Sequence, residues 1–247
     1  MSLLEVRGLT KVYSGLTAVS AVDFSVQEGS ITALIGPNGA GKTTCFNLIA
    51  GATRCTAGQV LFDGQDITGQ TPEQACERGI ARTFQIVRPL AGMSVLENVV
   101  VGALLREHSV ATAERQAMAV LERIGLGAKA HASASALALP ERKLLELAKA
   151  LATRPRLLML DEVMAGLRPT EADGIAQVLR DLNGEGLTIL LIEHVMRVVM
   201  AVAQTIVVLH HGEKIAEGEP GQIAHNPKVI ECYFGGGAAH LAVKAAR

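Results

Sequence analysis

The chain has 247 residues, of which 49% are hydrophobic and 19% charged, and this balance excludes a disordered chain and allows a substantial core. The net charge is −1, only 3% of the residues are aromatic and tryptophan is absent, so the composition does not favour a nucleic-acid-binding surface. The four cysteines contain no C-x-x-C pair, which argues against a zinc site or a disulfide framework and favours a reducing cytoplasm.

The N-terminus and the longest apolar stretch carry no targeting or membrane-spanning signal. The first residues, MSLLEVRGLTK, lack the charged head and long apolar core of a secretory signal. The stretch 198–209 is interrupted by Gln204 and Thr205 and is too short to span a bilayer. We therefore expect a soluble protein that reaches a membrane only through a partner.

The first predicted elements are strands at 3–9 and 19–26, the second with partial alternation of apolar and polar residues. Tyr13 lies between them. Two interpretations of this tyrosine are about equally good: a half-buried turn residue, or an aromatic ring that stacks on a nucleotide base.

The next stretch, GPNGAGKTT, matches the phosphate-binding pattern G-x-x-x-x-G-K-[ST] between an apolar run at 31–35 and a helical segment at 45–50. Its glycines permit close backbone approach, so that N–H groups and the positive end of the helix can bind phosphate oxygens. Lys42 suits the β- and γ-phosphates, and the Thr43 hydroxyl suits Mg²⁺. The predicted triphosphate-binding residues are Gly36, Pro37, Asn38, Gly39, Ala40, Gly41, Lys42, Thr43 and Thr44.

Beyond this loop the sequence predicts a strand at 60–62, a short helix at 72–78 that begins near Thr71, and a short strand that ends at Gln85. The chain then becomes helical. Helices are predicted from the capping box at Ser94, over 112–124 and from Pro140, and together they form an insert in an α/β frame.

The α/β alternation resumes with the unbroken apolar run 157–160, which is typical of a parallel strand buried on both faces. A helix at 171–183, a strand at 188–192 and two last strands at 205–209 and 214–216 follow. We expect the strand 157–160 to lie directly beside the strand that feeds the phosphate loop. Ligands bind at the carboxyl ends of such strands, so the polar residues there are the candidates for chemistry.

Asp161 and Glu162 directly follow the apolar run. Asp161 suits a role linked to Mg²⁺, and Glu162 is then placed to orient or deprotonate the attacking water; the alternative is two solvated acids. His194 follows the next strand and can bond the γ-phosphate and steady the water, although a structural histidine is the alternative. The Gln85 amide can reach Mg²⁺ or the water. His210 and His211 are predicted to cap a turn.

In this order, Tyr13, GPNGAGKTT, Gln85, LLMLDE and His194 resemble the nucleotide-binding subunit of ABC transporters over nearly the whole chain. The resemblance implies a P-loop NTPase (ABC ATPase) fold of class α/β, with a RecA-like core, an antiparallel β subdomain and a helical subdomain insert. It implies ATP and Mg²⁺ as cofactors. It assigns roles as follows: adenine stacking to Tyr13, the Q-loop to Gln85, the Walker B aspartate to Asp161, the catalytic glutamate to Glu162 and the switch histidine to His194.

Two further stretches, GIARTFQIVRPLAGMSVLENVVVGALL and IAEGEPGQIAHNPKVIECYFG, are similar to bacterial branched-chain amino acid import ATPases. Urea and short-chain amide importers share the pattern, as to a lesser degree does the lipopolysaccharide-export ATPase. The implied organisation is one ABC ATPase domain, 1–247. Its catalytic core with the β subdomain is 1–87 and 154–234, its helical subdomain 88–153 and its C-terminal tail 235–247.

The chain departs from the family pattern at two places. The family signature, LSGGQ or LSYGQ, aligns with Leu137–Glu141, which we call the signature segment. Its serine has become Ala138, which has no hydroxyl, and the glycine that approaches the γ-phosphate has become Pro140, which has no N–H. After the Walker B motif, Arg168 replaces the usual Asp or Asn of the D-loop. The hydrolytic set is therefore intact, whereas the half-site offered to a partner is altered.

The resemblance implies an ATPase that drives solute import, with branched-chain amino acids as the expected solute. Its implied partners are a second ABC ATPase subunit, in a homodimer or, more in keeping with the altered signature, a heterodimer; transmembrane permease subunits; and, indirectly, a periplasmic or extracellular solute-binding protein. The expected location is peripheral, on the cytoplasmic side of the inner membrane.

Three alternatives stay open: an importer of urea, amides or another polar solute, an ATP-dependent dimerisation module with weak hydrolysis, and a non-transport ABC protein. The last usually needs a second cassette, a long coiled coil or a basic face, none of which the sequence contains.

Overall fold

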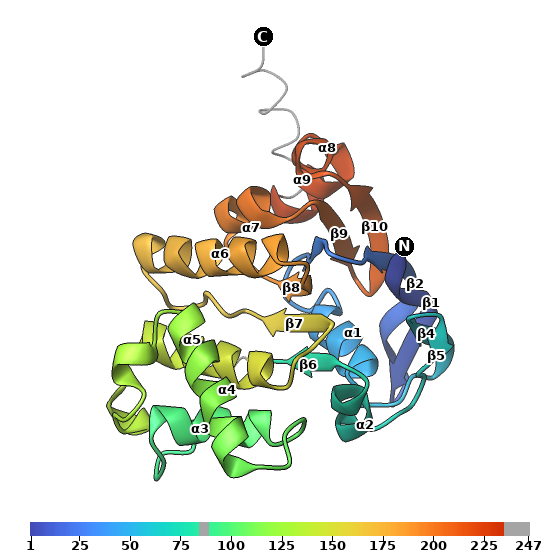
Figure 1. Ribbon diagram of the computed structural model, residues 1–247. Coiled ribbons are helices and arrows are strands. Elements are labelled where there is room, and N and C mark those ends of the chain that lie inside the picture. The colour runs from blue at the N-terminus through green and yellow to red at the C-terminus, as the bar shows by residue number, and fades with distance from the viewer. Residues whose placement is uncertain (84–88, 235–247) are drawn as a thin grey trace.

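A six-stranded sheet in the order β10-β9-β3-β8-β7-β6 forms the centre of the computed structural model, which describes residues 1–83 and 89–234 (Figure 1). Strands β3 (Ile31–Ile35), β7 (Leu157–Asp161) and β8 (Thr188–Ile192) are buried along their whole length. Their unbroken apolar sequences suit parallel strands that are covered on both faces. β6 (Ile80–Arg82) and β9 (Thr205–His210) extend the parallel pairing, and β10 (Glu213–Gly218) pairs antiparallel at one edge.

The predicted neighbour of the loop strand is wrong. β8 lies between β3 and β7, so the strand that ends in Asp161 is one place further from the phosphate loop than expected. The run 157–160 correctly predicts a buried strand, but a crossover connection leaves no mark in local sequence. Strand order therefore had to come from the structure.

The second sheet is antiparallel, in the order β2-β1-β4-β5. Its strands are β1 (Ser2–Tyr13), β2 (Leu16–Gln27), β4 (Ala57–Phe62) and β5 (Gln65–Asp66). β1 and β2 are longer than predicted because they form one hairpin, which closes at Ser14 and Gly15, both with positive φ. Helix α1 (Lys42–Ile49) buries Phe46 in a hydrophobic cluster that contains residues of both sheets.

The predicted helical insert contains α3 (Val95–Ala103), α4 (Val110–Arg123), α5 (Leu139–Ala152) and two short 3₁₀ turns, Gly127–Lys129 and Ala134–Ala136. The capping box predicted at Ser94 is present: its hydroxyl accepts from the Glu97 N–H, and the Glu97 carboxylate accepts from the Ser94 N–H. At Gly102 a Cβ would lie 2.5 Å from the Lys149 carbonyl oxygen, so this glycine lets α3 pack closely on α5.

The other helices are α2 (Pro72–Glu77), α6 (Pro169–Gly184), α7 (Met196–Val202), α8 (Pro220–Ala224) and α9 (Pro227–Phe234). α2 begins directly after Thr71, as predicted, and the Thr71 side chain caps it. Within residues 1–83 and 89–234, none of the helices has the length and apolar character needed to cross a lipid bilayer. Gln85 and the predicted tail, 235–247, lie outside the described residues.

Candidate nucleotide-binding site

The phosphate loop connects the carboxyl end of β3 to the start of α1, and its glycines are required by close packing. Gly36 and Gly41 have φ values of 150° and 99°. A Cβ at Gly36 would lie 2.1 Å from the Leu209 carbonyl oxygen, and one at Gly41 would lie 2.6 Å from that of Ala18. The loop is therefore confined between β9 and the β1–β2 hairpin, with its shape set by backbone contacts.

Lys42, the first residue of α1, is buried, and its Nζ donates to the carbonyl oxygens of Gly36 (2.7 Å) and Pro37 (2.9 Å). Burial lowers the pKa of Lys42, while the negative charges of Glu162 and Asp161 oppose that shift. The ammonium thus lies inside the loop, where an anion would relieve the cost of its burial.

A cleft of about 600 Å³ opens over this loop. Five parts of the chain meet there: the start of β2, the phosphate loop after β3, Glu162 after β7, His194 after β8 and His211 after β9. The cleft lies at the carboxyl ends of parallel strands, as the sequence predicts for a ligand site. Its lining residues are Leu16, Thr17, Ala18, Asn38, Gly39, Ala40, Gly41, Lys42, Thr43, Thr44, Glu162, His194 and His211.

Glu162 and His194 come together in this cleft, with 2.7 Å between Glu162 Oε1 and His194 Nε2. Glu162 has a φ of 50°, the left-handed conformation that a side chain rarely adopts. Its N–H donates to the Ile192 carbonyl (2.9 Å), which ties the turn after β7 to the end of β8. A carboxylate and an imidazole in contact above a phosphate loop can orient a water molecule and handle its proton.

Glu193 holds the segment after β7 through a hydrogen bond to its backbone. Its buried carboxylate accepts a hydrogen bond from the Met164 N–H at 2.8 Å. Burial raises the pKa of Glu193, and the N–H groups of Met164 and His194 partly oppose this.

Asp161 lies at the end of β7, behind the cleft wall, and only 2% of it is exposed. Its Oδ2 accepts from Arg82 Nη2 at 2.8 Å, and Arg82 Nη1 donates to Asn47 Oδ1 on α1 at 2.6 Å. Oδ1 is also buried, and no described residue gives it a hydrogen bond. Arg82 is a site residue that the sequence did not predict, although its position at the end of a strand, in RTFQ, could have indicated a role.

Tyr13 and His211 lie differently from expectation. Tyr13 is 42% exposed at the end of β1, with Lys11 Nζ 4.7 Å from its ring centroid, and it is not among the cleft-lining residues. The hairpin residues that follow it, Leu16–Ala18, do line the cleft. His211 sits in a turn as predicted, but it also faces the cleft, because Gly212 N–H donates to the Ala40 carbonyl and holds that turn on the loop.

The signature segment forms the start of α5. Ala138 is the N-cap residue and cannot accept a hydrogen bond through its side chain, but the Glu141 carboxylate accepts from the Ala138 N–H at 3.0 Å. Lys129 forms an ion pair with Glu141. Half of a capping box, together with Pro140 in the first turn, therefore still starts the helix.

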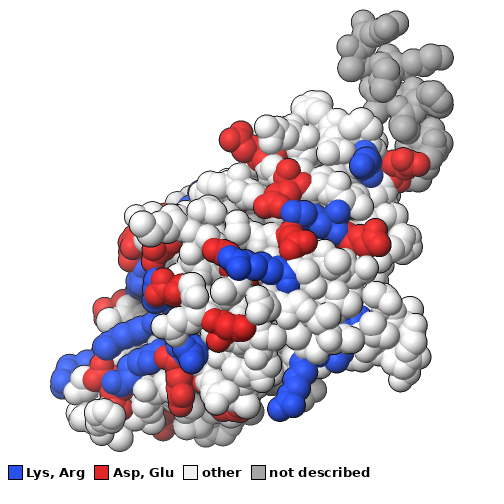
Figure 2. Space-filling view, turned by 90° about the vertical axis from the view of Figure 1, so that its right-hand side faces the viewer, with Lys and Arg blue, Asp and Glu red and all other residues white. Residues whose placement is uncertain are grey.

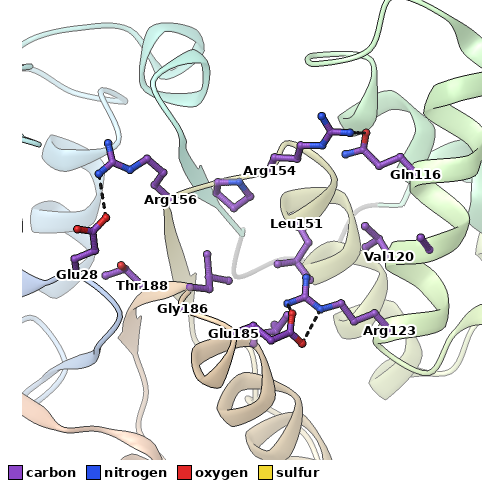
Figure 3. A pocket seen from close by; sticks show the side chains of 14 residues that line it. Glu28, Gln116, Val120, Arg123, Leu151, Arg154, Arg156, Glu185, Gly186 and Thr188 are labelled. Atoms are coloured by element: carbon purple, nitrogen blue, oxygen red, sulfur yellow. Dashed lines mark hydrogen bonds and ion pairs between the residues drawn. The ribbon is translucent and has the colours of Figure 1, made fainter.

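A second cavity, of about 540 Å³, lies at the opposite, amino ends of β7 and β8 (Figure 3). It separates α4 and α5 from the end of α6, and an ion pair between Arg123 of α4 and Glu185 crosses it. Arg154 bonds Gln116, and Arg156 bonds Glu28. These side chains are largely exposed, so the Arg123–Glu185 and Arg154–Gln116 pairs hold the insert to the core only weakly.

Acidic and basic side chains are interspersed on the face of the described residues that Figure 2 shows, and neither sign forms a continuous patch there. This face therefore has no strong electrostatic preference for a polyanion.

Comparison with protein families finds two matches. A family described as "ABC transporter" matches residues 19–165, and a family described as "Branched-chain amino acid ATP-binding cassette transporter" matches residues 213–239. The first match includes the phosphate loop, Asp161 and Glu162. The second covers β10, α8 and α9.

Among curated proteins, the chain is 40% identical to the high-affinity branched-chain amino acid transport ATP-binding protein BraF of Pseudomonas aeruginosa, over 94% of this chain and 98% of that protein. It is 40% identical, with the same coverage, to LivG of Escherichia coli K12, which carries the same description. The probable LivG of Archaeoglobus fulgidus is 36% identical over 95% of this chain and 96% of its own length.

Solved structures agree. A nucleotide-free ATP-binding cassette from an ABC transporter superposes with a TM-score of 0.87 at 32% identity, covering 95% of this chain and all of its own. A cassette described in its ADP conformation gives the same TM-score at 33% identity, covering 95% of this chain and 99% of its own. The predicted α/β P-loop fold with an inserted helical segment is confirmed.

Proposed function

The chain belongs to the ABC transporter ATPases, in the group of branched-chain amino acid transport ATP-binding proteins, and from that membership we propose that it drives import of branched-chain amino acids through separate membrane subunits. The observation that carries the site assignment is the cleft, which joins the phosphate loop, Glu162 and His194. We infer that each of these groups acts in ATP hydrolysis.

The phosphate loop is proposed to bind the triphosphate. Lys42 would exchange its hydrogen bonds with the Gly36 and Pro37 carbonyls for the β- and γ-phosphates, and the N–H groups of the loop would bind the other oxygens. Glu162 would orient or deprotonate the attacking water, with His194 steadying it and the γ-phosphate. The 2.7 Å contact between Glu162 Oε1 and His194 Nε2 supports this joint role.

The residues present fit Mg²⁺. Asp161 Oδ1 is buried and lacks a hydrogen-bond partner among the described residues, and Thr43 presents a hydroxyl at the cleft. One carboxylate, one hydroxyl and phosphate oxygens form the oxygen-rich set that Mg²⁺ prefers. When bound, the ion supplies charge neutralisation for the transferring phosphoryl group. Gln85, also expected to contact the metal and the water, lies outside the described residues.

Tyr13 is proposed to stack on the adenine. The hairpin that carries it also supplies Leu16, Thr17 and Ala18 to the cleft wall, so a base placed beside the loop would lie near the end of β1. An exposed ring is available for stacking on a ligand.

The altered signature segment supports a partner cassette with an intact signature, and hence a heterodimer. The two cassettes would dock on transmembrane permease subunits at the cytoplasmic face of the membrane, with a solute-binding protein on the other side. We propose a single domain organised as predicted, with 88–153 as its helical subdomain. The same altered segment favours a second candidate function, an ATP-driven dimerisation module with weak hydrolysis.

The test is reconstitution of the full-length chain with its second cassette and permease subunits in proteoliposomes, together with the solute-binding protein. We expect leucine, isoleucine and valine to stimulate ATP hydrolysis and to accumulate inside, whereas urea and acetamide do neither. Stimulation by urea or acetamide alone would reassign the solute. Dimerisation with ATP but no solute-stimulated hydrolysis would favour the second candidate.

A further inference from the structure

Lys143 is a buried cation on α5 that the hydrolytic scheme above does not use. It lies two residues after the signature segment, and only 4% of it is exposed. Its Nζ donates to the backbone carbonyl of Glu162 at 3.2 Å. A side chain of the helical insert therefore reaches the backbone directly after β7.

The surroundings of Lys143 are strongly acidic. Burial lowers the pKa of its ammonium, and the negative charges of Glu193, Glu162, Asp161 and Glu146 oppose that shift. Glu193 and Asp161 are each 2% exposed, so the lysine faces carboxylates that are themselves removed from water. A buried ammonium is costly unless charges and acceptors surround it, which makes this an ordered contact rather than a loose surface pair.

Glu162 needs such a contact. Its left-handed backbone, with φ of 50°, is unfavourable for a residue with a side chain and persists only where neighbours hold it. Its N–H is held by the Ile192 carbonyl on β8, and its carbonyl by Lys143 on α5. With both ends of the residue fixed, the carboxylate extends into the cleft to His194.

We propose that Lys143 is a positioning residue that fixes the backbone of Glu162 and thereby links the signature segment to the hydrolytic carboxylate of the same chain. The inference rests on the catalytic role proposed above for Glu162. α5 begins at the signature segment. A nucleotide that is bound in the partner's site and contacts this segment would therefore shift the helix that carries Lys143. The two nucleotide sites of a dimer are then connected within one chain. The connection runs along α5 from Glu141 to Lys143 and through the hydrogen bond from Lys143 to the Glu162 carbonyl.

The test compares Lys143→Met and Lys143→Arg in the full-length chain assembled with its second cassette and permease subunits. Lys149→Met is the matched control, because Lys149 lies on the same helix and pairs with Glu146 instead. The readouts are kcat, KM for ATP, the Kd of a fluorescent ATP analogue and the thermal unfolding midpoint.

We expect Lys143→Met to lower kcat by at least about tenfold, since small misplacements of a catalytic group can cost about a hundredfold. KM and nucleotide Kd should stay within about twofold, because the phosphate loop is unchanged. Lys143→Arg, which keeps a donor, should recover most of kcat, and Lys149→Met should leave it unchanged. Lys143→Gln, too short to reach the carbonyl but polar, replaces the methionine variant if that one does not fold.

A folded Lys143→Met chain with kcat within twofold of the unsubstituted chain would overturn the inference, as would a matching loss of nucleotide affinity. Glu162→Gln separates this result from the proposed function. If Glu162→Gln retains turnover, the catalytic assignment itself fails. If it is inactive while Lys143→Met is fully active, only the positioning role fails.

Discussion

The phosphate loop and the signature segment both lead into a helix, but they offer different groups to a phosphate. In the loop, three glycines with positive φ lead into α1, and Lys42 supplies a buried cation. In the signature segment, Pro140 has no N–H, and the Glu141 carboxylate already accepts from the Ala138 N–H. A helix N-terminus attracts phosphate only where its N–H groups are free.

The two regions also differ in what holds them. The phosphate loop is confined by β9 and by the β1–β2 hairpin, where a Cβ would collide with backbone oxygens of Leu209 and Ala18. The signature segment is held by the contacts of one helix start, including the Lys129–Glu141 ion pair. Substitution in the loop should therefore abolish function, whereas Ala138 and Pro140 of the signature segment should tolerate substitution and even gain from it.

The largest effect is expected from Glu162→Gln, which keeps the shape of the side chain but removes the base. General-base catalysis contributes about 10² to 10⁴ in rate, so kcat of the assembled chain should fall by at least about a hundredfold. Nucleotide Kd should stay within a few-fold, because the loop is intact. Steady-state ATPase assays and analogue binding measure the two quantities. A kcat within tenfold of the unsubstituted value would move the role of base to another group.

The next largest effect is expected from Lys42→Met, which should weaken the binding of ATP to the phosphate loop. It removes the one cation inside the loop, so the affinity for ATP should fall by at least about tenfold, as expected for loss of a charge-assisted bond of about 1.5–3 kcal/mol. The thermal midpoint should not fall, because the lost lysine was a desolvated cation with a lowered pKa. Titration with a fluorescent analogue and thermal unfolding check both points. Lys228→Met is the control, because Lys228 is exposed on α9 and is not among the residues that line the cleft.

Much of the site formed by the phosphate loop, Glu162 and His194 could be predicted from sequence, because each of these parts is marked by a short, local sequence pattern. The pattern GPNGAGKTT, and the apolar runs that precede Glu162 and His194, place these residues at strand ends. Of them, residues 38–44, Glu162 and His194 line one cleft. Thr71 and Ser94 likewise mark the starts of α2 and α3, each of which begins at the next residue.

What sequence could not provide are the pairs that join distant segments. Arg82 and Asp161 are 79 residues apart, and Lys143 reaches the Glu162 carbonyl from another helix. No periodicity or motif records which strand inserts between β3 and β7, so the neighbour predicted for the loop strand was wrong. His211 was read as a turn residue, because its second role depends on how the turn rests on the loop.

Restoring the family residues of the signature segment should raise the ATPase activity of the chain. In the chain alone, any dimer pairs each phosphate loop with an altered signature, so hydrolysis should be slow. Ala138→Ser combined with Pro140→Gly restores a hydroxyl and an N–H, and we expect ATP turnover of the chain alone to rise about tenfold, the value of one or two hydrogen bonds to a charged group.

Pro220→Gly is the matched control for that repair, because Pro220 also lies in the first turn of a helix, α8, but outside both nucleotide-binding regions. It should leave turnover unchanged. Brisk hydrolysis by the unsubstituted chain alone, abolished by Glu162→Gln, would contradict the asymmetric dimer, since it would show that the altered signature is competent.

The smallest effect is expected from Tyr13→Ala. Stacking of a base on an aromatic side chain contributes about 1–3 kcal/mol, and an exposed ring should lie at the low end, so KM for ATP should rise about fivefold with kcat unchanged. Tyr13→Phe should behave like the unsubstituted chain, because stacking needs the ring and not the hydroxyl. Comparison with GTP gives the sharper measurement: if Tyr13 contacts only the base, its loss should weaken both nucleotides by similar factors. An unchanged KM in Tyr13→Ala would instead assign the ring to its contact with Lys11, and the base-binding surface to Leu16–Ala18.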